Sequence, residues 1–346
     1  MTAEEILKFA HNKSLRLSVK SSKMISKNER TRLREIARFQ EFSNEVKGKL
    51  REAVEGFPSL DRLHPFYLEL TDILVGLDRL KRSLGAIYNC IPPIDEIINT
   101  HMQALKLTDD YRQMKRTRSA GKGRIASIVK ATAENLDFII SAKKKLSLLP
   151  GIIPDSPTIV CAGFPNVGKS TLVRQVSTAE PEIAFYPFTT KKVIMGHLKV
   201  LDQTVQIVDT PGLLDRPMSS RNDIERQAVT ALKYLAQVII FIIDPSEACG
   251  WPINEQVHLL REVQRLFPVI PILIAINKLD IAPPEKLLEV RRLVPRAYEI
   301  VASEGKGVDE LLKDAVEEVD LKSLQESISE HVASLSREES DSSDGE

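Results

Sequence analysis

Residues 158–171, TIVCAGFPNVGKST, have the composition and spacing of a phosphate-binding segment. The order along the chain is an apolar, β-branched run at 158–160, then Gly163, four variable residues, and Gly168, Lys169, Ser170 and Thr171. This order is typical of the strand, glycine-rich loop and helix start of a P-loop. The pattern therefore predicts chemistry on a phosphate group.

The residue types in this loop have geometric reasons. Gly163 and Gly168 allow the backbone to approach an anion with its N–H groups pointing inward, and the following helix adds its N-terminal amides. Lys169 supplies a positive charge for the β- and γ-phosphates, and the Ser170 hydroxyl is placed to bind Mg²⁺. The rest of the expected phosphate site comprises Pro165, Asn166, Val167 and Thr171.

Two further short strings fit the same chemistry. In DTPG, residues 209–212, Asp209 can hold Mg²⁺ through water and the Gly212 amide can contact the γ-phosphate. In YPFTT, residues 186–190, a threonine hydroxyl can complete the Mg²⁺ coordination, and we favour Thr190 over Thr189. The predicted catalytic set is Lys169, Thr190, Gly212 and Asn166, and the nucleotide contacts also include Phe188, Thr189, Thr210 and Pro211.

The string NKLD, residues 277–280, predicts the base. The Asp280 carboxylate can accept both the N1–H and the exocyclic amino hydrogens of guanine, a donor pair that adenine lacks. A site built on such paired hydrogen bonds rejects the wrong base by roughly 10⁴ or more. We expect Asn277 to brace the loop and contact N7, and the Lys278 stem to lie on the base plane. Each string is common by itself, so specificity lies in the ordered set.

The elements that must position these residues change character near residue 150. After the proline-rich connector LPGIIPDSP, apolar runs alternate with helical patterns, which predicts a doubly wound α/β domain with a mostly parallel sheet. The expected strands are 158–162, 193–200, 204–208, 237–243, 270–276 and 297–301. The expected helices are 169–177, 222–235, 253–266, 283–293 and 307–317. In such a sheet, ligands bind at the carboxyl ends of the strands, where the strings above fall.

Residues 1–147 show helical periodicity throughout. Stretches such as 29–56, 66–91 and 124–149 carry apolar residues three and four apart with few glycines. An all-α bundle of about five helices is the simplest fold that buries such stripes.

The two halves of the chain carry opposite net charges. Residues 1–150 have 28 Lys/Arg against 18 Asp/Glu, and residues 151–346 have 20 against 30. The basic residues gather at 20–38 and 115–124, KRTRSAGKGR, where Gly121 and Gly123 interrupt the run. Contact with an RNA backbone and an ordinary solvated helix face are both open interpretations of these clusters.

With these motifs in order, the chain resembles the nucleolar GTP-binding protein (NOG) family in its short archaeal form, within the Obg-related branch of the translation-factor-class GTPases. The resemblance rests on GFPNVGKST, YPFTT, KRTRSAGKGRIASI, the run DTPGLLDRPMSSRNDIERQAVTAL and DPSEACGW. It implies a slow GTPase that uses GTP, GDP and Mg²⁺ and acts in assembly of the large ribosomal subunit, bound to precursor ribosomal RNA and proteins.

Two sequence features bear on that implied activity. Leu213 and Leu214 follow DTPG where Ras-like proteins have a glutamine that orients water. GTPases that this chain resembles use a monovalent cation, which the asparagine of the P-loop helps to hold. The matching residue here is Asn166, so the resemblance implies K⁺ as a candidate cofactor. The alternative interpretation of Asn166 is a loop residue that hydrogen-bonds its own backbone.

The fifth guanine motif is usually Ser-Ala-x, and the matching residues here are Val301, Ala302 and Ser303. The Ala302 amide remains able to meet guanine O6, because this contact uses the backbone.

The expected organisation is a basic helical bundle at 1–150, a GTPase domain at 151–318, a C-terminal helix at 319–335 and an acidic disordered tail at 336–346. We expect a cytoplasmic protein with no membrane partner, because its three cysteines are scattered and the chain shows neither a signal peptide nor an apolar run of ~18 residues. We also expect a monomer that does not bind DNA. Two alternatives are a non-switching RNA placeholder with a structural nucleotide site, and an Obg-like translation or stress regulator. Cys161 is expected to be buried in its strand, and Trp251 to be a packing residue.

Overall fold

A computed structural model describes residues 1–17, 26–149, 151, 153, 156–185, 192–200, 203–209 and 212–319. The expected site residues at 186–190 and at 210–211 lie outside this part of the chain, as do nearly all of the predicted C-terminal helix and the acidic tail. The chain divides into two compact units, residues 1–63 with 74–147, and residues 64–73 with those from 148 onward. Within the described residues, no helix combines the length and apolar character that crossing a membrane requires.

The described part of residues 1–147 is mostly helical, as predicted, but it forms more helices than the expected five. The described residues hold seven α-helices here: α1 (Ala3–Arg16), α2 (Lys27–Glu55), α3 (Pro65–Val75), α4 (Leu77–Asn89), α5 (Ile91–Leu107), α6 (Tyr111–Ala131) and α7 (Ala133–Leu146). Gly76, whose φ is 78°, divides the stretch of helical periodicity over 66–91 into α3 and α4. Thr132 likewise separates α6 from α7.

Side-chain caps explain where several of these helices begin. Thr2 and Glu5 form a reciprocal capping box at α1, and Ser26 accepts a hydrogen bond from the Glu29 amide at α2. Asp110 caps α6 by accepting from the Gln113 amide at 2.9 Å. Each cap satisfies backbone N–H groups that the first helical turn leaves without partners.

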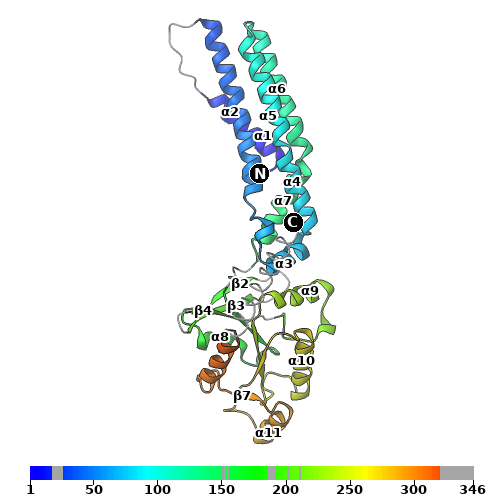
Figure 1. Ribbon diagram of the computed structural model, residues 1–346, viewed down its shortest axis with the longest axis vertical. Coiled ribbons are helices and arrows are strands. Elements are labelled where there is room, and N and C mark those ends of the chain that lie inside the picture. The colour runs from blue at the N-terminus through cyan, green and yellow to red at the C-terminus, as the bar shows by residue number, and fades with distance from the viewer. Residues whose placement is uncertain are drawn as a thin grey trace, which may run out of the picture. The chain divides into compact units, whose positions relative to one another are not determined.

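The core of the helical unit lies between its long helices. Helices α2, α5 and α6 pack side by side (Figure 1), and Phe39, Leu105 and Ile125 are fully buried between them. A Cβ atom at Gly121 would lie 2.7 Å from Phe39 Cζ, so only glycine permits this close approach of α6 to α2. The helix runs unbroken through Gly121 and Gly123, so these residues interrupt the charge pattern without interrupting the helix.

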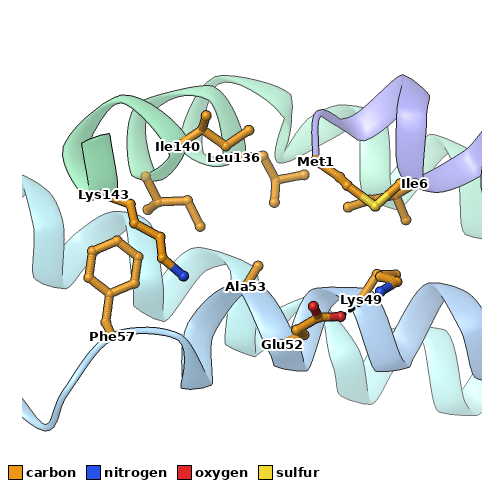
Figure 2. Close-up of a pocket in the computed structure, with 10 residues that line it drawn as sticks. Met1, Ile6, Lys49, Glu52, Ala53, Phe57, Leu136, Ile140 and Lys143 are labelled. Carbon is orange, nitrogen blue, oxygen red and sulfur yellow. Dashed lines mark hydrogen bonds and ion pairs between the residues drawn. The ribbon is translucent and has the colours of Figure 1, made fainter. Parts of the chain in front are cut away.

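A small cavity of about 150 Å³ lies in the helical unit between α1, α2 and α7. Figure 2 shows its mixed lining: Leu136 and Lys143 of α7 and Ile6 of α1 lie across the cavity from Lys49 and Glu52 of α2. Lys49 and Glu52 form an ion pair at 2.6 Å.

The second unit is built on a seven-stranded sheet with the order β2-β3-β4-β1-β5-β6-β7. Its strands are β1 (Thr158–Ala162), β2 (Glu182–Phe185), β3 (Lys192–Val200), β4 (Gln203–Asp209), β5 (Val238–Ile243), β6 (Ile272–Ile276) and β7 (Ala297–Glu299). The strands from β4 to β7 in this order are parallel, and β2 and β3 join antiparallel at one edge. The predicted α/β class and mostly parallel sheet are therefore confirmed.

The helices of this unit are α8 (Lys169–Val176), α9 (Asp223–Ala231), α10 (Ile253–Leu266) and α11 (Pro284–Leu293), followed by a helix over 308–319. Helix α8 and the helix 308–319 lie on one side of the sheet and α10 on the other (Figure 1). The predicted helix 222–235 is shorter than expected, because a 3₁₀ turn at Leu232–Tyr234 follows α9. Strand β2 was not predicted, since its four residues, EIAF, are too few for a clear pattern.

Candidate nucleotide site

The glycine-rich loop leaves the middle of the sheet. Strand β1 pairs in parallel with β4 on one side and β5 on the other, so the loop opens at the carboxyl end of the central strand. Gly163 and Gly168 have φ values of 126° and 111°. A Cβ atom on Gly163 would lie 2.5 Å from the Ile242 carbonyl oxygen, so the sequence needs glycine there for both conformation and space.

Lys169, the first residue of α8, is directed into this loop. Its side chain is only 6 % exposed, and its Nζ donates hydrogen bonds to the Gly163 and Phe164 carbonyl oxygens, both at 2.8 Å. These contacts hold the ammonium group over the loop, where the phosphates are expected.

The predicted magnesium ligands Ser170 and Asp209 are brought together. Asp209 ends β4 and is fully buried, and the Ser170 hydroxyl donates a hydrogen bond to its Oδ2 atom. A hydroxyl and a carboxylate side by side supply the oxygen ligands that Mg²⁺ prefers, so these two residues fit the ion. The third expected ligand, Thr190, lies outside the described residues.

Asn277 connects the phosphate loop to the predicted base-binding loops. Its Nδ2 donates to the Val167 carbonyl at 2.8 Å, and its Oδ1 accepts from the Ala302 amide at 2.9 Å. A Cβ atom on Gly168 would lie 2.1 Å from Asn277 Nδ2, so the second P-loop glycine also makes room for this bridge. Asn277 thus braces the two loops through its side chain. The Ala302 amide, predicted to meet guanine O6, donates to Asn277 Oδ1 in this structure.

The remaining predicted base contacts surround this bridge. Asp280 and Ser303 are exposed, whereas Val301 is buried and forms an antiparallel bridge with Lys306. Lys278 has a left-handed φ of 61°, and its Nζ lies 2.7 Å from Asp244 Oδ2.

The loop after β5 carries the string DPSEACGW, in which only Trp251 had a predicted role. Asp244, fully buried, accepts hydrogen bonds from the Cys249 amide and from Ser246 in addition to its ion pair with Lys278. Trp251 stacks on Phe164 of the P-loop with ring centroids 4.3 Å apart, which confirms its predicted packing role. The sequence offered one sign of the role of Asp244, because this polar residue directly follows a fully apolar strand.

The segment after DTPG packs against the P-loop. The Gly163 amide donates to the Leu214 carbonyl at 3.0 Å, and the side chains of Leu213 and Leu214 are buried. Neither leucine side chain has a polar atom, so neither can orient a water molecule by hydrogen bonding.

Two smaller predictions concern the strand and the loop themselves. Cys161 is fully buried in β1, as predicted, and its burial, followed by the nearby Asp209 charge, raises the pKa of the thiol, which therefore stays protonated. Asn166 is exposed with a left-handed φ of 64°, a conformation that asparagine tolerates better than most residues.

A strand, a glycine-rich loop with an inward lysine, a paired serine and aspartate, and an asparagine that bridges to the next loops define a P-loop GTPase fold. Residues 1–152 match the NOG1 N-terminal helical domain, and residues 223–280 match the family described as nucleolar GTP-binding protein 1 (NOG1). The chain belongs to the NOG1 family.

Several known proteins and one solved structure are similar to this chain. The chain is 38 % identical over 270 residues to nucleolar GTP-binding protein 1 of Drosophila melanogaster, covering 78 % of this chain and 41 % of the relative. It is 41 % identical to an uncharacterized protein of Methanocaldococcus jannaschii, covering 70 % of this chain and 67 % of that protein. A crystal structure of a putative nucleolar GTP-binding protein 1 from Plasmodium falciparum aligns at 32 % identity and a TM-score of 0.47, over 55 % of this chain and 100 % of that one.

The chain spans about two fifths of the length of the Drosophila relative that it matches.

Proposed function

We propose that this protein binds GTP and Mg²⁺ and hydrolyses GTP to GDP and phosphate. The observation that carries the proposal is the Asn277 bridge, which joins the Val167 carbonyl of the phosphate loop to the Ala302 amide of the fifth motif. The bridge brings the phosphate loop next to the loop for which a guanine contact is proposed, so both ends of one nucleotide could bind there. The relatives are named as GTP-binding proteins, which supports the same assignment.

The chemistry follows from the groups in that crevice. A water oxygen forms a bond to the γ-phosphorus while the bond from that phosphorus to the β–γ bridging oxygen breaks, so that GDP leaves. Lys169 and the loop amides stabilise the negative charge on the transferring group. Ser170 and Asp209 would hold Mg²⁺, which neutralises charge on the β- and γ-phosphates when bound.

Hydrolysis by the isolated protein should be slow. The buried Leu213 and Leu214 supply no group that orients the attacking water, so the protein must obtain this help elsewhere. K⁺ held with the help of Asn166 is one source, and a macromolecular partner is the other. Stimulation of turnover by K⁺ over Na⁺, and its loss in Asn166→Ala, would support the first source.

We further propose that the helical unit contacts an RNA backbone. Its helix α6 exposes five cations that form no ion pair within the described residues: Arg112, Lys115, Arg116, Arg124 and Lys130. An open groove of about 480 Å³ next to them is lined by Lys8, His11, Lys122 and Lys130, together with Glu4 and apolar residues such as Phe42. Arg118 is engaged with Glu35 at 2.8 Å and is less available. Unpaired cations along one helix are suited to phosphate contacts.

The biological setting proposed is assembly of the large ribosomal subunit, with precursor ribosomal RNA and proteins as partners and with the protein acting as a cytoplasmic monomer. An Obg-like translation or stress regulator would show no enrichment with large-subunit particles on a sucrose gradient. A non-switching RNA placeholder would keep its assembly function in Ser170→Ala, whereas a switch would lose it while RNA binding persists. Crosslinking to RNA with sequencing, in GTP and in GDP, would identify the contact.

The base assignment has its own test. Asp280→Asn should weaken binding of GTP and favour xanthosine triphosphate, because xanthine presents an acceptor where guanine presents its amino group. Equal binding of ATP and GTP by the wild-type protein would overturn the proposed function.

A further inference from the structure

The Asp215 carboxylate accepts a hydrogen bond from the Gly212 amide, which is the group that should contact the γ-phosphate under the proposed function. The Gly212 N–H donates a hydrogen bond of 2.7 Å to Asp215 Oδ2, three residues further along the same loop. An anionic phosphate oxygen and an anionic carboxylate oxygen are alternative acceptors for one N–H group. A γ-phosphate that binds this amide must therefore displace the Asp215 carboxylate.

A buried cation stands next to the same carboxylate. Asp215 and Arg221 are 5 % and 4 % exposed, and Arg221 Nη2 lies 3.9 Å from Asp215 Oδ1. This separation is too long for a hydrogen bond. The guanidinium instead donates to the Gly212 carbonyl at 2.6 Å and to the Arg216 carbonyl at 2.8 Å. Arg221 is thus fixed by backbone contacts beside a carboxylate that it does not yet bond.

Both residues have unused bonding capacity facing this gap. Asp215 Oδ1 and Arg221 Nε are buried, and neither atom makes a hydrogen bond within the described residues. Buried polar atoms without partners are costly, so a small shift that joins them is favourable. Burial, the largest influence, lowers the pKa of Arg221, but a guanidinium keeps its charge at neutral pH.

The other charges around this site are already committed. Arg216 pairs with Glu225 at 2.9 Å, and Glu262 accepts from the Met218 amide at 3.2 Å. Arg221 is therefore the cation placed to receive the Asp215 carboxylate among the described residues.

We propose that Asp215 is the specificity-determining residue that makes this loop respond to the third phosphate of the nucleotide. Its carboxylate holds the Gly212 amide when the nucleotide is GDP, and moves onto Arg221 when a γ-phosphate takes the amide. This inference rests on the proposed function. Displacing Asp215 from the Gly212 amide offsets part of the favourable free energy of GTP binding. The free protein therefore prefers GTP over GDP less than it would without this carboxylate.

The test compares the affinities of a non-hydrolysable GTP analogue and of GDP in single variants. Asp215→Asn keeps a neutral acceptor for Gly212 but removes the charge that competes with the phosphate. It should strengthen binding of the analogue by about tenfold and leave the GDP affinity within about twofold of wild type. The matched control is Asp223→Asn, an exposed aspartate on the same segment 3.6 Å from Arg226, which should change neither affinity.

A second variant tests the receiving cation. Arg221→Gln should weaken binding of the analogue several-fold with little change for GDP, and it should have no such effect when combined with Asp215→Asn. The GDP affinity and the thermal unfolding midpoint of each variant report whether the site is intact.

The outcomes separate the two proposals. Failure of the wild-type protein to bind either nucleotide would overturn the proposed function. Wild-type binding with equal shifts of both affinities in Asp215→Asn, or a stronger preference for the analogue in Arg221→Gln, would overturn only the role of Asp215.

Discussion

Lys278, in the predicted base-binding loop, forms an ion pair of 2.7 Å with Asp244, which is fully buried at the end of the neighbouring strand. Lys278 also has a left-handed backbone, with φ at 61°. The pair therefore fixes a strained residue at the place where the stem of Lys278 is expected to lie on the guanine ring.

Replacing Asp244 by Asn should destabilise the protein and weaken GTP binding. Removing one partner of a buried pair leaves the other charge uncompensated, and because Lys278 is partly exposed we expect a loss of about 1–3 kcal/mol in the free energy of unfolding. Denaturant unfolding and nucleotide titration measure the two effects. Glu289→Gln, which removes an exposed partner of Lys286 at 3.8 Å, is the control and should cost about 1 kcal/mol at most. Equal losses in the two variants would contradict the role given to Asp244.

Gly168→Ala should abolish nucleotide binding and destabilise the second unit by about 2 kcal/mol or more. Its φ of 111° is unfavourable for alanine, and the added Cβ would lie 2.1 Å from Asn277 Nδ2. The same substitution at Gly48, in the middle of α2 with no atom within 4 Å, should stabilise the protein by about 0.5–1 kcal/mol. Calorimetry distinguishes the two, and wild-type nucleotide affinity in Gly168→Ala would refute the prediction.

Nucleotide binding should change the intrinsic tryptophan fluorescence. Trp251 is the single tryptophan of the chain, and it stacks on Phe164 in the P-loop at 4.3 Å between ring centroids. Movement of the loop on binding alters that contact, so emission should titrate with GTP. Phe164→Leu should shrink the change while a labelled nucleotide still binds. An unchanged emission at saturation in the wild-type protein would count against this coupling.

RNA binding should weaken as pH rises through about 8. Burial, and next the charges of Arg118 and Arg38, lower the pKa of Lys122 to about 8, with Glu35 acting in the opposite direction. The ammonium that can meet a phosphate is therefore lost above that pH. Filter binding from pH 7 to 9 should show the decline, and Lys122→Gln should remove it. The control is Lys130→Gln, which leaves Lys122 intact. This variant should bind RNA more weakly than wild type but show the same dependence on pH.

The lowered pKa of Lys122 affects folding stability in the direction opposite to its effect on RNA binding. The unfolded Lys122 titrates near 10.5, so between about pH 8 and 10.5 the unfolded chain binds more protons than the folded one. The contribution of this group to the free energy of unfolding therefore rises with pH across that window. Urea unfolding of wild type and Lys122→Gln at pH 7.5 and 9.5 would reveal the difference, and a smaller rise in the wild type than in the variant would contradict it.

The local parts of the site could be predicted from sequence, because glycines and a strand-to-helix change specify them within a few residues. Gly163, Gly168 and Lys169 are examples, and the paired Ser170 and Asp209 follow once β1 and β4 are neighbours. The contacts between Asp244 and Lys278 and between Trp251 and Phe164 could not be predicted, because they depend on strand order and on loop conformations that no single residue dictates.

In the helical unit too, some features could be predicted from sequence and others could not. Periodicity predicted helices throughout this part of the chain, but the number of helices depends on breaks at Gly76 and Thr132. The sequence pattern does not distinguish these breaks from glycine or threonine residues that a helix tolerates in its interior. Gly121 is such a tolerated residue, and only its contact with Phe39 explains why it is there.

The continuity of helix α6 sets a minimum size for whatever lies along it. Arg112 and Lys130 are 18 positions apart, which is about five turns, so both project from the same face roughly 27 Å from each other. An oligonucleotide much shorter than that span can neutralise one end of the row only. Affinity measured against a ladder of RNA lengths should therefore climb until the fragment bridges both ends, and then level off.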